Sequence, residues 1–502
     1  MAKPHRAAVP RRAWRRRAAA LLRSLPLGFA LVLAAESPRA DDTLTDLILP
    51  ESQEKQLAEE EHPKVVAQFG GEYKTPALEH YFGGLVANLG RVSNRPDIAY
   101  RVTILNSPVP NAFALPAGYV YVTRGLLAIA NSEAEISGVL GHEIGHITAR
   151  HVAQRYSRAI MAEGLLGILG AITQGTSYAG ITTLAQPLAQ VVLQSYSREQ
   201  ENEADLYGVT YMSRAGYDPY AMASFLSALG ADIKLEAEIA GQPNPDRFDL
   251  LATHPRTADR VIKTIEEAKV ASVSQPVVER RRYLETIDGI LYGDDPEQGF
   301  VRGRVFAHPK IGFRFEVPEG FTLLNGAEQV IAPGPGRSLI RFDQAKLDAD
   351  PSPERYLREG WLEGRPVQNF ESLRVNGYPA ATGTARLNGD DGQLDLRLVA
   401  IKVGPRTIYR FLFVTASELT PRYGEAFRRT IESFRSLSEV ERGQLKPYRI
   451  RVVTARPGDT VDSLAAQLPY ADHRVERLRV LNGLKMDQAV EPGRPVKLVT
   501  EG

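Results

Sequence analysis

The residues best placed to do chemistry are two histidines and a glutamate in the run His142-Glu143-Ile144-Gly145-His146. Residues four apart share one face of a helix, so both imidazoles could reach a single metal ion. Glu143 follows the first histidine and could take a proton from a water on that ion, since zinc lowers the pKa of such a water toward neutrality. The run predicts zinc-dependent attack of water on a carbonyl carbon.

The alternative is that these are two solvated histidines on an exposed helix face. Their neighbours argue against it, because apolar residues surround the run: Ile136, Val139, Leu140, Ile144 and Ile147. A helix with such neighbours is expected to be buried. Buried ionisable groups need partners, and a metal ion is one such partner.

A catalytic zinc site needs a third protein ligand, and the acidic run at 197–205 offers several carboxylates. Glu201 and Asp205 are four apart and share one helical face. We expect Glu201 to bind zinc and Asp205 to accept the free ring N–H of a ligand histidine. The alternative for this run is a solvated helix face.

Helices are expected to position these groups. One is predicted over 132–156, with Asn131 or Ser132 as its N-cap and acidic residues in its first turn. A second is predicted over 196–215, ended by Gly216.

Alternating residues at 100–104 and the run 117–122 predict two strands beside these helices. The apolar, glycine-rich stretch at 159–192 favours a buried hairpin or a mobile lid over a membrane span, because glycines and polar residues interrupt it.

Four motifs together resemble the zinc metallopeptidase family of the CAAX prenyl protease and HtpX, its soluble periplasmic members most of all. They are Gly141 to His146, Glu201 to Asp205, Thr253-His254-Pro255, and Arg260. The resemblance covers about residues 45–270. It implies a mainly helical zincin fold of the gluzincin type with a small sheet. It also implies one zinc per chain, with Glu201 as the third ligand and Arg260 beside the ligands.

The resemblance also assigns His254 and a possible substrate strand. His254 corresponds to a histidine near the metal, which holds the site closed, contacts zinc or takes part in catalysis; its other interpretation is a helix-start residue before Pro255. The segment Asn111-Ala112-Phe113-Ala114 resembles the strand beside the active site, which would bind an extended peptide through its main chain. Its other interpretation is purely structural.

Composition limits the remaining classes of function. Hydrophobic residues make up 43% of the chain and charged residues 24%, which is typical of a folded globular protein. The net charge of +1 gives no basic field for nucleic acid. The chain has no cysteine, so thiol catalysis and cysteine zinc sites are excluded. Basic residues followed by an apolar stretch predict an N-terminal signal peptide and therefore export.

We expect a multidomain chain, because one core seldom serves 502 residues. The expected parts are a signal peptide (1–40), the metallopeptidase domain (41–275), a linker (276–302), an α+β domain without an evident catalytic site (303–440), and a small βααβ domain (447–502). The last resembles a LysM module, which would bind peptidoglycan; a small packing domain is the alternative. No tetratricopeptide pattern follows residue 270.

These features predict a zinc endopeptidase of the cell envelope that degrades misfolded or stalled exported and outer-membrane proteins. Periplasmic localisation is expected, with membrane association left open. Its expected partners are unfolded or misassembled envelope proteins, and the outer-membrane assembly machinery and peptidoglycan are further candidates. The alternatives are a largely latent peptidase that acts as a chaperone or scaffold, and a peptidoglycan-anchored binding protein.

Overall fold

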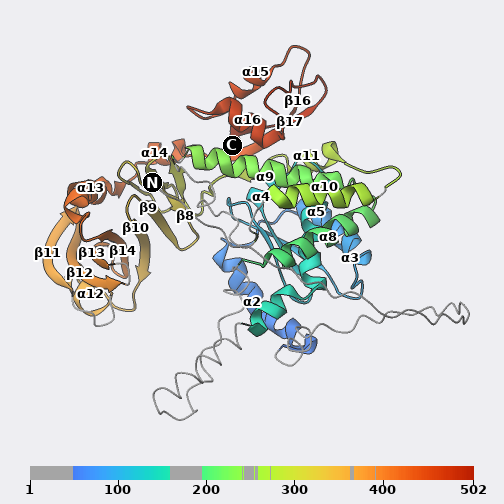
Figure 1. The fold of residues 1–502 in the computed structure, drawn as a ribbon. Coiled ribbons are helices and arrows are strands. Elements are labelled where there is room, and N and C mark those ends of the chain that lie inside the picture. Colours follow the sequence, from blue (N-terminus) through green and yellow to red (C-terminus); the bar gives the residue numbers. More distant parts are fainter. Residues whose placement is uncertain are drawn as a thin grey trace, which may run out of the picture.

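The computed structural model describes residues 49–158, 195–239, 241, 254, 258–271, 273–361, 367–389 and 392–502. The expected signal peptide and the glycine-rich stretch at 159–192 lie outside these residues. Figure 1 shows a helical body with a β-rich unit on one side and a small C-terminal unit packed on its helices. Within the described part of the chain, no helix is both long and apolar enough to cross a membrane.

The helical body surrounds a three-stranded sheet of order β1-β3-β2. Strand β3 (Tyr119–Thr123) lies between β1 (Arg101–Leu105), to which it is parallel, and β2 (Ala112–Leu115), to which it is antiparallel. Both strands predicted from the sequence are therefore present, and the segment between them forms the third. The helices are α2 (Glu51–Gln68), α3 (Pro76–Arg91), α4 (Arg124–Ile129), α5 (Glu133–Thr148), α8 (Arg198–Arg214), α9 (Tyr220–Ile239) and α10 (Ala258–Val270).

Helix α5 begins as predicted and ends earlier than predicted. The Ser132 hydroxyl accepts a hydrogen bond from the Glu135 N–H at 3.2 Å, which caps the first turn. The helix does not run on to residue 156, because Arg150 takes a left-handed backbone conformation with φ 56°. The Arg150 side chain donates to Glu54 of α2 at 2.8 Å, and a new helical run starts at His151.

Three glycines let α5 and α8 approach closely. A Cβ on Gly141 would lie 3.2 Å from the Gly208 carbonyl oxygen, and one on Gly145 would lie 2.9 Å from the Tyr207 Cβ. A Cβ on Gly208 would in turn lie 3.2 Å from the His142 backbone nitrogen. Since the two helices carry the two predicted ligand sets, this contact brings those sets together.

The β-rich unit is built from two antiparallel sheets. The larger has the order β11-β12-β13-β14-β10-β9-β8 and the smaller β15-β7-β6-β5. This mixture of strands and helices agrees with the α+β domain expected over 303–440, and it includes β7 (Phe313–Glu316), β10 (Ser338–Lys346), β14 (Thr407–Ala416) and α13 (Thr420–Ser433). The other elements are β5 (Phe300–Arg302), β6 (Val305–His308), β8 (Leu324–Asn325), β9 (Gln329–Gly334), α12 (Pro353–Glu359), β11 (Gln368–Val375), β12 (Tyr378–Gly389), β13 (Gly392–Gly404), β15 (Arg435–Ser436) and α14 (Glu439–Gln444).

The C-terminal unit has the expected βααβ order: β16 (Tyr448–Thr454), α15 (Val461–Ala465), α16 (Arg474–Asn482) and β17 (Pro495–Glu501). Its sheet gains a third strand, β4 (Leu291–Tyr292), which pairs with β16.

The segment 276–302, expected as a linker, is structured instead. It contains β4, β5 and helix α11 (Arg280–Ile287), whose Tyr283, Leu284 and Ile287 belong to the core of the helical body. An amphipathic helix of eight residues between charged neighbours gives too weak a local signal to be recognised as a core element.

Candidate metal centre

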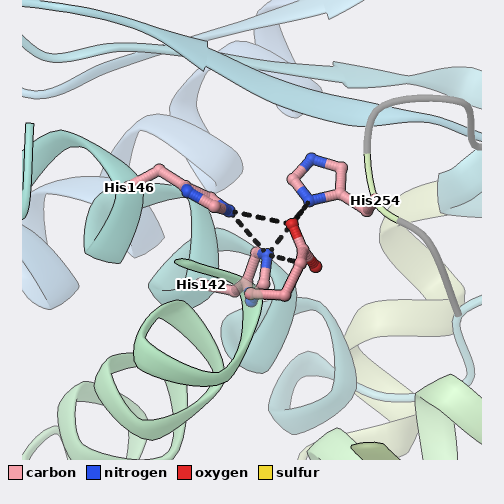
Figure 2. Close-up of side chains that lie close together, drawn as sticks. His142, His146 and His254 are labelled. Carbon is pink, nitrogen blue, oxygen red and sulfur yellow. Dashed lines mark hydrogen bonds and ion pairs between the residues drawn. The ribbon is translucent and has the colours of Figure 1, made fainter. Parts of the chain in front are cut away.

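Four side chains from three parts of the body converge on one buried point. They are His142 and His146 of α5, Glu201 of α8, and His254. Their potential ligand atoms all lie within 4.8 Å of one another, and all four residues are buried. Figure 2 shows the three imidazoles directed toward a common centre.

The distances within this cluster are short for groups that carry lone pairs. The Nε2 atoms of His142 and His146 are 3.0 Å apart, and the Glu201 Oε1 lies 3.5 Å from the His146 Nε2. The His142 Nδ1 lies 2.9 Å from an Asp205 carboxylate oxygen, which can only accept, so this nitrogen carries a proton. In the neutral ring the His142 Nε2 then carries a lone pair that points toward its neighbours.

A cation at the centre resolves this crowding of lone pairs. Burial lowers the pKa of His142, but the hydrogen bond to Asp205 and the charge of Glu201 outweigh it, so this pKa is raised. Burial lowers the pKa of His146 well below its usual value, so this imidazole keeps a lone pair that a metal ion can accept. The Glu143 Oε2 is buried without a hydrogen-bond partner among the described residues. Two imidazoles and a carboxylate are a usual donor set for zinc, so the residues fit a metal ion.

Asp205 and Arg260 contact the potential ligands from outside the cluster. Arg260 donates to both Asp205 oxygens at 2.7 Å and lies 2.5 Å from the Glu201 Oε2. Burial raises the pKa of Glu201, but the charges and hydrogen bonds of His254, His146 and Arg260 outweigh it, so this pKa lies well below its usual value. Glu201 is therefore an anion at neutral pH, as a metal ligand must be.

Glu143 lies beside the four potential metal ligands and is not one of them. It is buried, and its Oε1 is 3.5 Å from the His254 Nε2. Burial raises the pKa of Glu143, against the charges of His254 and His142, which lower it. A raised pKa makes this carboxylate a better proton acceptor, which is what a general base requires.

His254 lies in the cluster and not merely at a helix start. Its Nδ1 is 2.8 Å from the Glu201 Oε1 and 3.2 Å from the His142 Nε2. The flanking Thr253 and Pro255 are outside the described residues. The placement of His254 makes it a potential fourth donor to the same ion.

His151 touches the cluster, although its position five residues after His146 would place it on another face of a continuous helix. Its Nδ1 lies 2.8 Å from the His146 Nδ1, and its Nε2 lies 3.5 Å from Glu203. The left-handed Arg150 turns the chain back and makes this contact possible. Only the end of the helix after Thr148 would have revealed the approach of His151 to His146. No residue type at that point of the sequence signals a helix end.

Tyr196 is a second residue that the sequence did not single out. Its ring stacks on the His146 imidazole with centroids 3.7 Å apart, and the Arg155 guanidinium lies 3.5 Å from the Tyr196 ring centroid. The Tyr196 ring also lies 5.1 Å from the His254 ring, so it packs against two imidazoles of the cluster and helps to fix the plane of the His146 ring.

Of the four predicted substrate-binding residues, Ala112 faces the site. It lines a small cavity with His142, Glu143, His254 and hydrophobic residues of α4 and α9. Phe113 instead packs on the other side, stacked on Tyr121 with ring centroids 4.9 Å apart. Asn111 precedes β2, and Ala114 belongs to the core of the helical body. Among the described strands, β2 is at the edge of its sheet.

The cavity beside Glu143 has a volume of about 50 Å³. A water needs roughly 10–15 Å³ of such volume, so the cavity holds a few waters and no peptide.

A glutamate beside paired histidines on one helix, with a carboxylate from a second helix, defines a metallopeptidase domain. Residues 75–269 match Peptidase family M48, so the chain carries a domain of that family.

Two relatives illustrate the extent of the match. The beta-barrel assembly-enhancing protease of Yersinia pestis is 32% identical over 192 residues, which are 37% of this chain and 38% of that protein. The mitochondrial metalloendopeptidase OMA1 of Arabidopsis thaliana is 34% identical over 180 residues, or 36% of this chain and 33% of that protein. The chain thus spans well under half the length of both relatives.

Among solved structures, cyanobacterial PsbP (CyanoP) from Synechocystis sp. PCC 6803 is 16% identical and covers 28% of this chain and 98% of its own, with a TM-score of 0.22. A TM-score this low supports no conclusion about fold or function.

Proposed function

We propose that the chain is a zinc-dependent endopeptidase. The observation that carries this proposal is the convergence of His142, His146 and Glu201 beside the buried carboxylate of Glu143. These three residues would hold the ion, which when bound acts as a Lewis acid and makes water a nucleophile at neutral pH. One zinc per chain is expected.

The residues of the chain have separate roles in this proposal. Glu143 accepts the proton of the attacking water and passes it to the leaving amine. Asp205 holds the His142 ring through its Nδ1, and Arg260 fixes both carboxylates in place. Burial of the whole group strengthens these interactions because water does not compete for them.

The proposed substrates are misfolded or stalled envelope proteins. Three observations support this: the match to relatives named beta-barrel assembly-enhancing protease, the predicted signal peptide, and an edge strand beside the site that suits sequence-tolerant binding of extended chains. Periplasmic localisation belongs to the same proposal, although the relative from Arabidopsis thaliana is named a mitochondrial metalloendopeptidase. The outer-membrane assembly machinery remains a candidate partner.

Metal analysis and casein cleavage test the proposal, using protein that lacks residues 1–40. Glu143→Gln should keep one zinc and lose roughly 10²–10⁴-fold in rate, because an amide cannot accept the proton. Glu199→Gln, on the exposed side of α8, is the matched control and should behave as wild type. Wild-type turnover in Glu143→Gln would exclude Glu143 as the base, and full zinc in His146→Ala would exclude the ligand set.

A largely latent enzyme, acting mainly as a chaperone or scaffold, is the second candidate. The small cavity and the position of His254 within the donor cluster favour it. If His254 occupies the place that water needs, His254→Ala should raise proteolysis, including self-cleavage, at unchanged zinc content. If His254 instead stabilises the oxyanion, the same substitution should lower the rate roughly 10²–10³-fold.

Peptidoglycan binding by residues 447–502 stays a prediction. The packing of this unit on the helical body means that a pull-down with peptidoglycan should use the whole chain. A chain without affinity for peptidoglycan would leave the unit with a packing role alone.

A further inference from the structure

A cleft of about 550 Å³ lies where the helical body, the β-rich unit and the C-terminal unit meet. Its walls include Val109 before β2, Asp232 and Glu236 of α9, Tyr292 of β4, Leu324 of β8 and Arg477 of α16. The volume falls in the range of ligand-binding clefts, about 300–1,000 Å³. Nothing in the peptidase chemistry described above uses this cleft.

The cleft and the active-site cavity lie next to each other along one face of α9. Phe225 and Leu229 line the cavity beside Glu143, whereas Asp232 and Glu236 line the cleft. These positions follow one another at helical spacings of three and four, so they form a single stripe.

Two further segments line both spaces. On α4, Leu126 lines the active-site cavity, whereas Gly125 and Ile129 line the cleft. At the edge strand, Ala112 lines the cavity and Pro110 the cleft. The two spaces are therefore neighbours on three separate elements.

The cleft walls suit an apolar and uncharged occupant. Glu236 pairs with Arg477 at 3.1 Å, and the cleft residue Arg304 pairs with Glu316 at 2.7 Å, so these charges are matched within the protein. Val109 and Leu324 are each 38% exposed, which leaves apolar surface for a ligand.

We propose that this cleft binds the segment of an extended, apolar polypeptide that flanks the scissile bond. This inference rests on the proposed peptidase function. The α9 stripe from Phe225 to Glu236 is roughly 16 Å long at 1.5 Å per residue. An extended chain needs about five residues to cover that length. Through Leu324, the β-rich unit thereby supplies part of the substrate site.

Binding can be measured without cleavage in the Glu143→Gln protein, with fluorescein-labelled casein followed by anisotropy. Leu324→Asp and Val109→Asp should each raise the Kd about tenfold, because a carboxylate in the apolar wall must be desolvated. Ile311→Asp is the matched control: Ile311 is 50% exposed on the same β-rich unit and lies off the cleft. An unchanged Kd in both cleft variants would overturn the assignment.

Peptide length gives a second readout in the active protein. A short cleavable peptide is compared with versions extended by about six apolar residues on either side. One extension should raise kcat/KM, and the ratio of long to short should fall about tenfold in Leu324→Asp while staying at the wild-type value in Ile311→Asp. An equal gain in kcat/KM from the extension in Leu324→Asp and in Ile311→Asp would overturn the proposal.

The two experiments separate this proposal from the proposed function. If no peptide is cleaved, the peptidase assignment fails, and the casein Kd still decides on the cleft. If peptides are cleaved and the cleft variants bind casein normally, the cleft proposal alone fails. Light scattering of the same variants detects self-association, and an oligomer lost in Leu324→Asp would make the cleft a contact between copies and overturn the substrate assignment.

Discussion

The β-rich unit and the C-terminal unit relate to the peptidase domain in opposite ways. The β-rich unit encloses its own apolar cores, one of them dominated by aromatic residues such as Phe313, Phe411 and Phe434. The C-terminal unit has no such independence among the described residues: Leu464, Leu478 and other core residues belong to the same cluster as the α5 helix. The β-rich unit is therefore an insertion with its own core, whereas the C-terminal unit is part of the peptidase core.

The chain path explains this difference. Strand β4 precedes the β-rich unit and β16 follows it, yet the two pair in one sheet. Arg302 donates to the Lys446 carbonyl at 3.1 Å, so the chain enters and leaves the β-rich unit at neighbouring points. An insertion with close ends can be tolerated without disturbing its host, since chain ends that lie together impose little strain.

Truncation gives the largest expected effect. Removing everything after Gln444 should destabilise the peptidase domain so strongly that soluble, zinc-binding protein is lost, because apolar surface shared with α4, α9 and α11 becomes exposed. Soluble yield, circular dichroism and zinc content measure this. The reciprocal control replaces residues 303–444 by a short Gly-Ser linker and should keep the fold and the zinc. Equal stability of both proteins would contradict the comparison.

A cavity in the β-rich unit should affect that unit alone. Phe411 is fully buried, so Phe411→Ala should cost about 3–5 kcal/mol in the unfolding of this unit. Calorimetry should show one transition moved to lower temperature, while zinc content and casein cleavage stay at wild-type values. Loss of zinc in this variant would show that the two cores unfold together.

Metal removal should destabilise the peptidase domain and the C-terminal unit and leave the β-rich unit unchanged. A chelator should lower the unfolding temperature of the transition that contains the peptidase domain and the C-terminal unit, because a ligand at a hundred times its Kd contributes about 2.7 kcal/mol. The transition of the β-rich unit should not move. A His146→Ala protein, which lacks a donor, serves as control and should not respond to the chelator.

A single buried lysine tests the contact between the C-terminal unit and the peptidase domain. The Lys497 Nζ is fully buried and donates to the carbonyls of Ala128 and Ala130 at the end of α4, at 2.5 and 2.7 Å. Lys497→Met leaves these acceptors unpartnered and should cost about 2 kcal/mol. Urea unfolding measures it, and Lys485→Met, an exposed lysine in the same unit, should be neutral within about 0.5 kcal/mol.

Local pattern was enough to predict much of the fold and the site. The starts of α5 and α8, the strands β1 and β3, and the strands β7, β10 and β14 all follow from periodicity and capping residues. Where a residue interrupts the pattern without a sequence signal, prediction failed. Arg150 gives no such signal, so the end of α5 and the approach of His151 were missed.

Helical spacing alone places His142, Glu143 and His146 on one helix, so their grouping follows from the sequence whatever the rest of the chain does. Which distant groups join them depends on the tertiary structure. His254 enters the cluster, and β4 pairs with β16 across the whole β-rich unit, through contacts between segments far apart in the chain. Such contacts depend on the packing of complete surfaces, and no local pattern of residues encodes them.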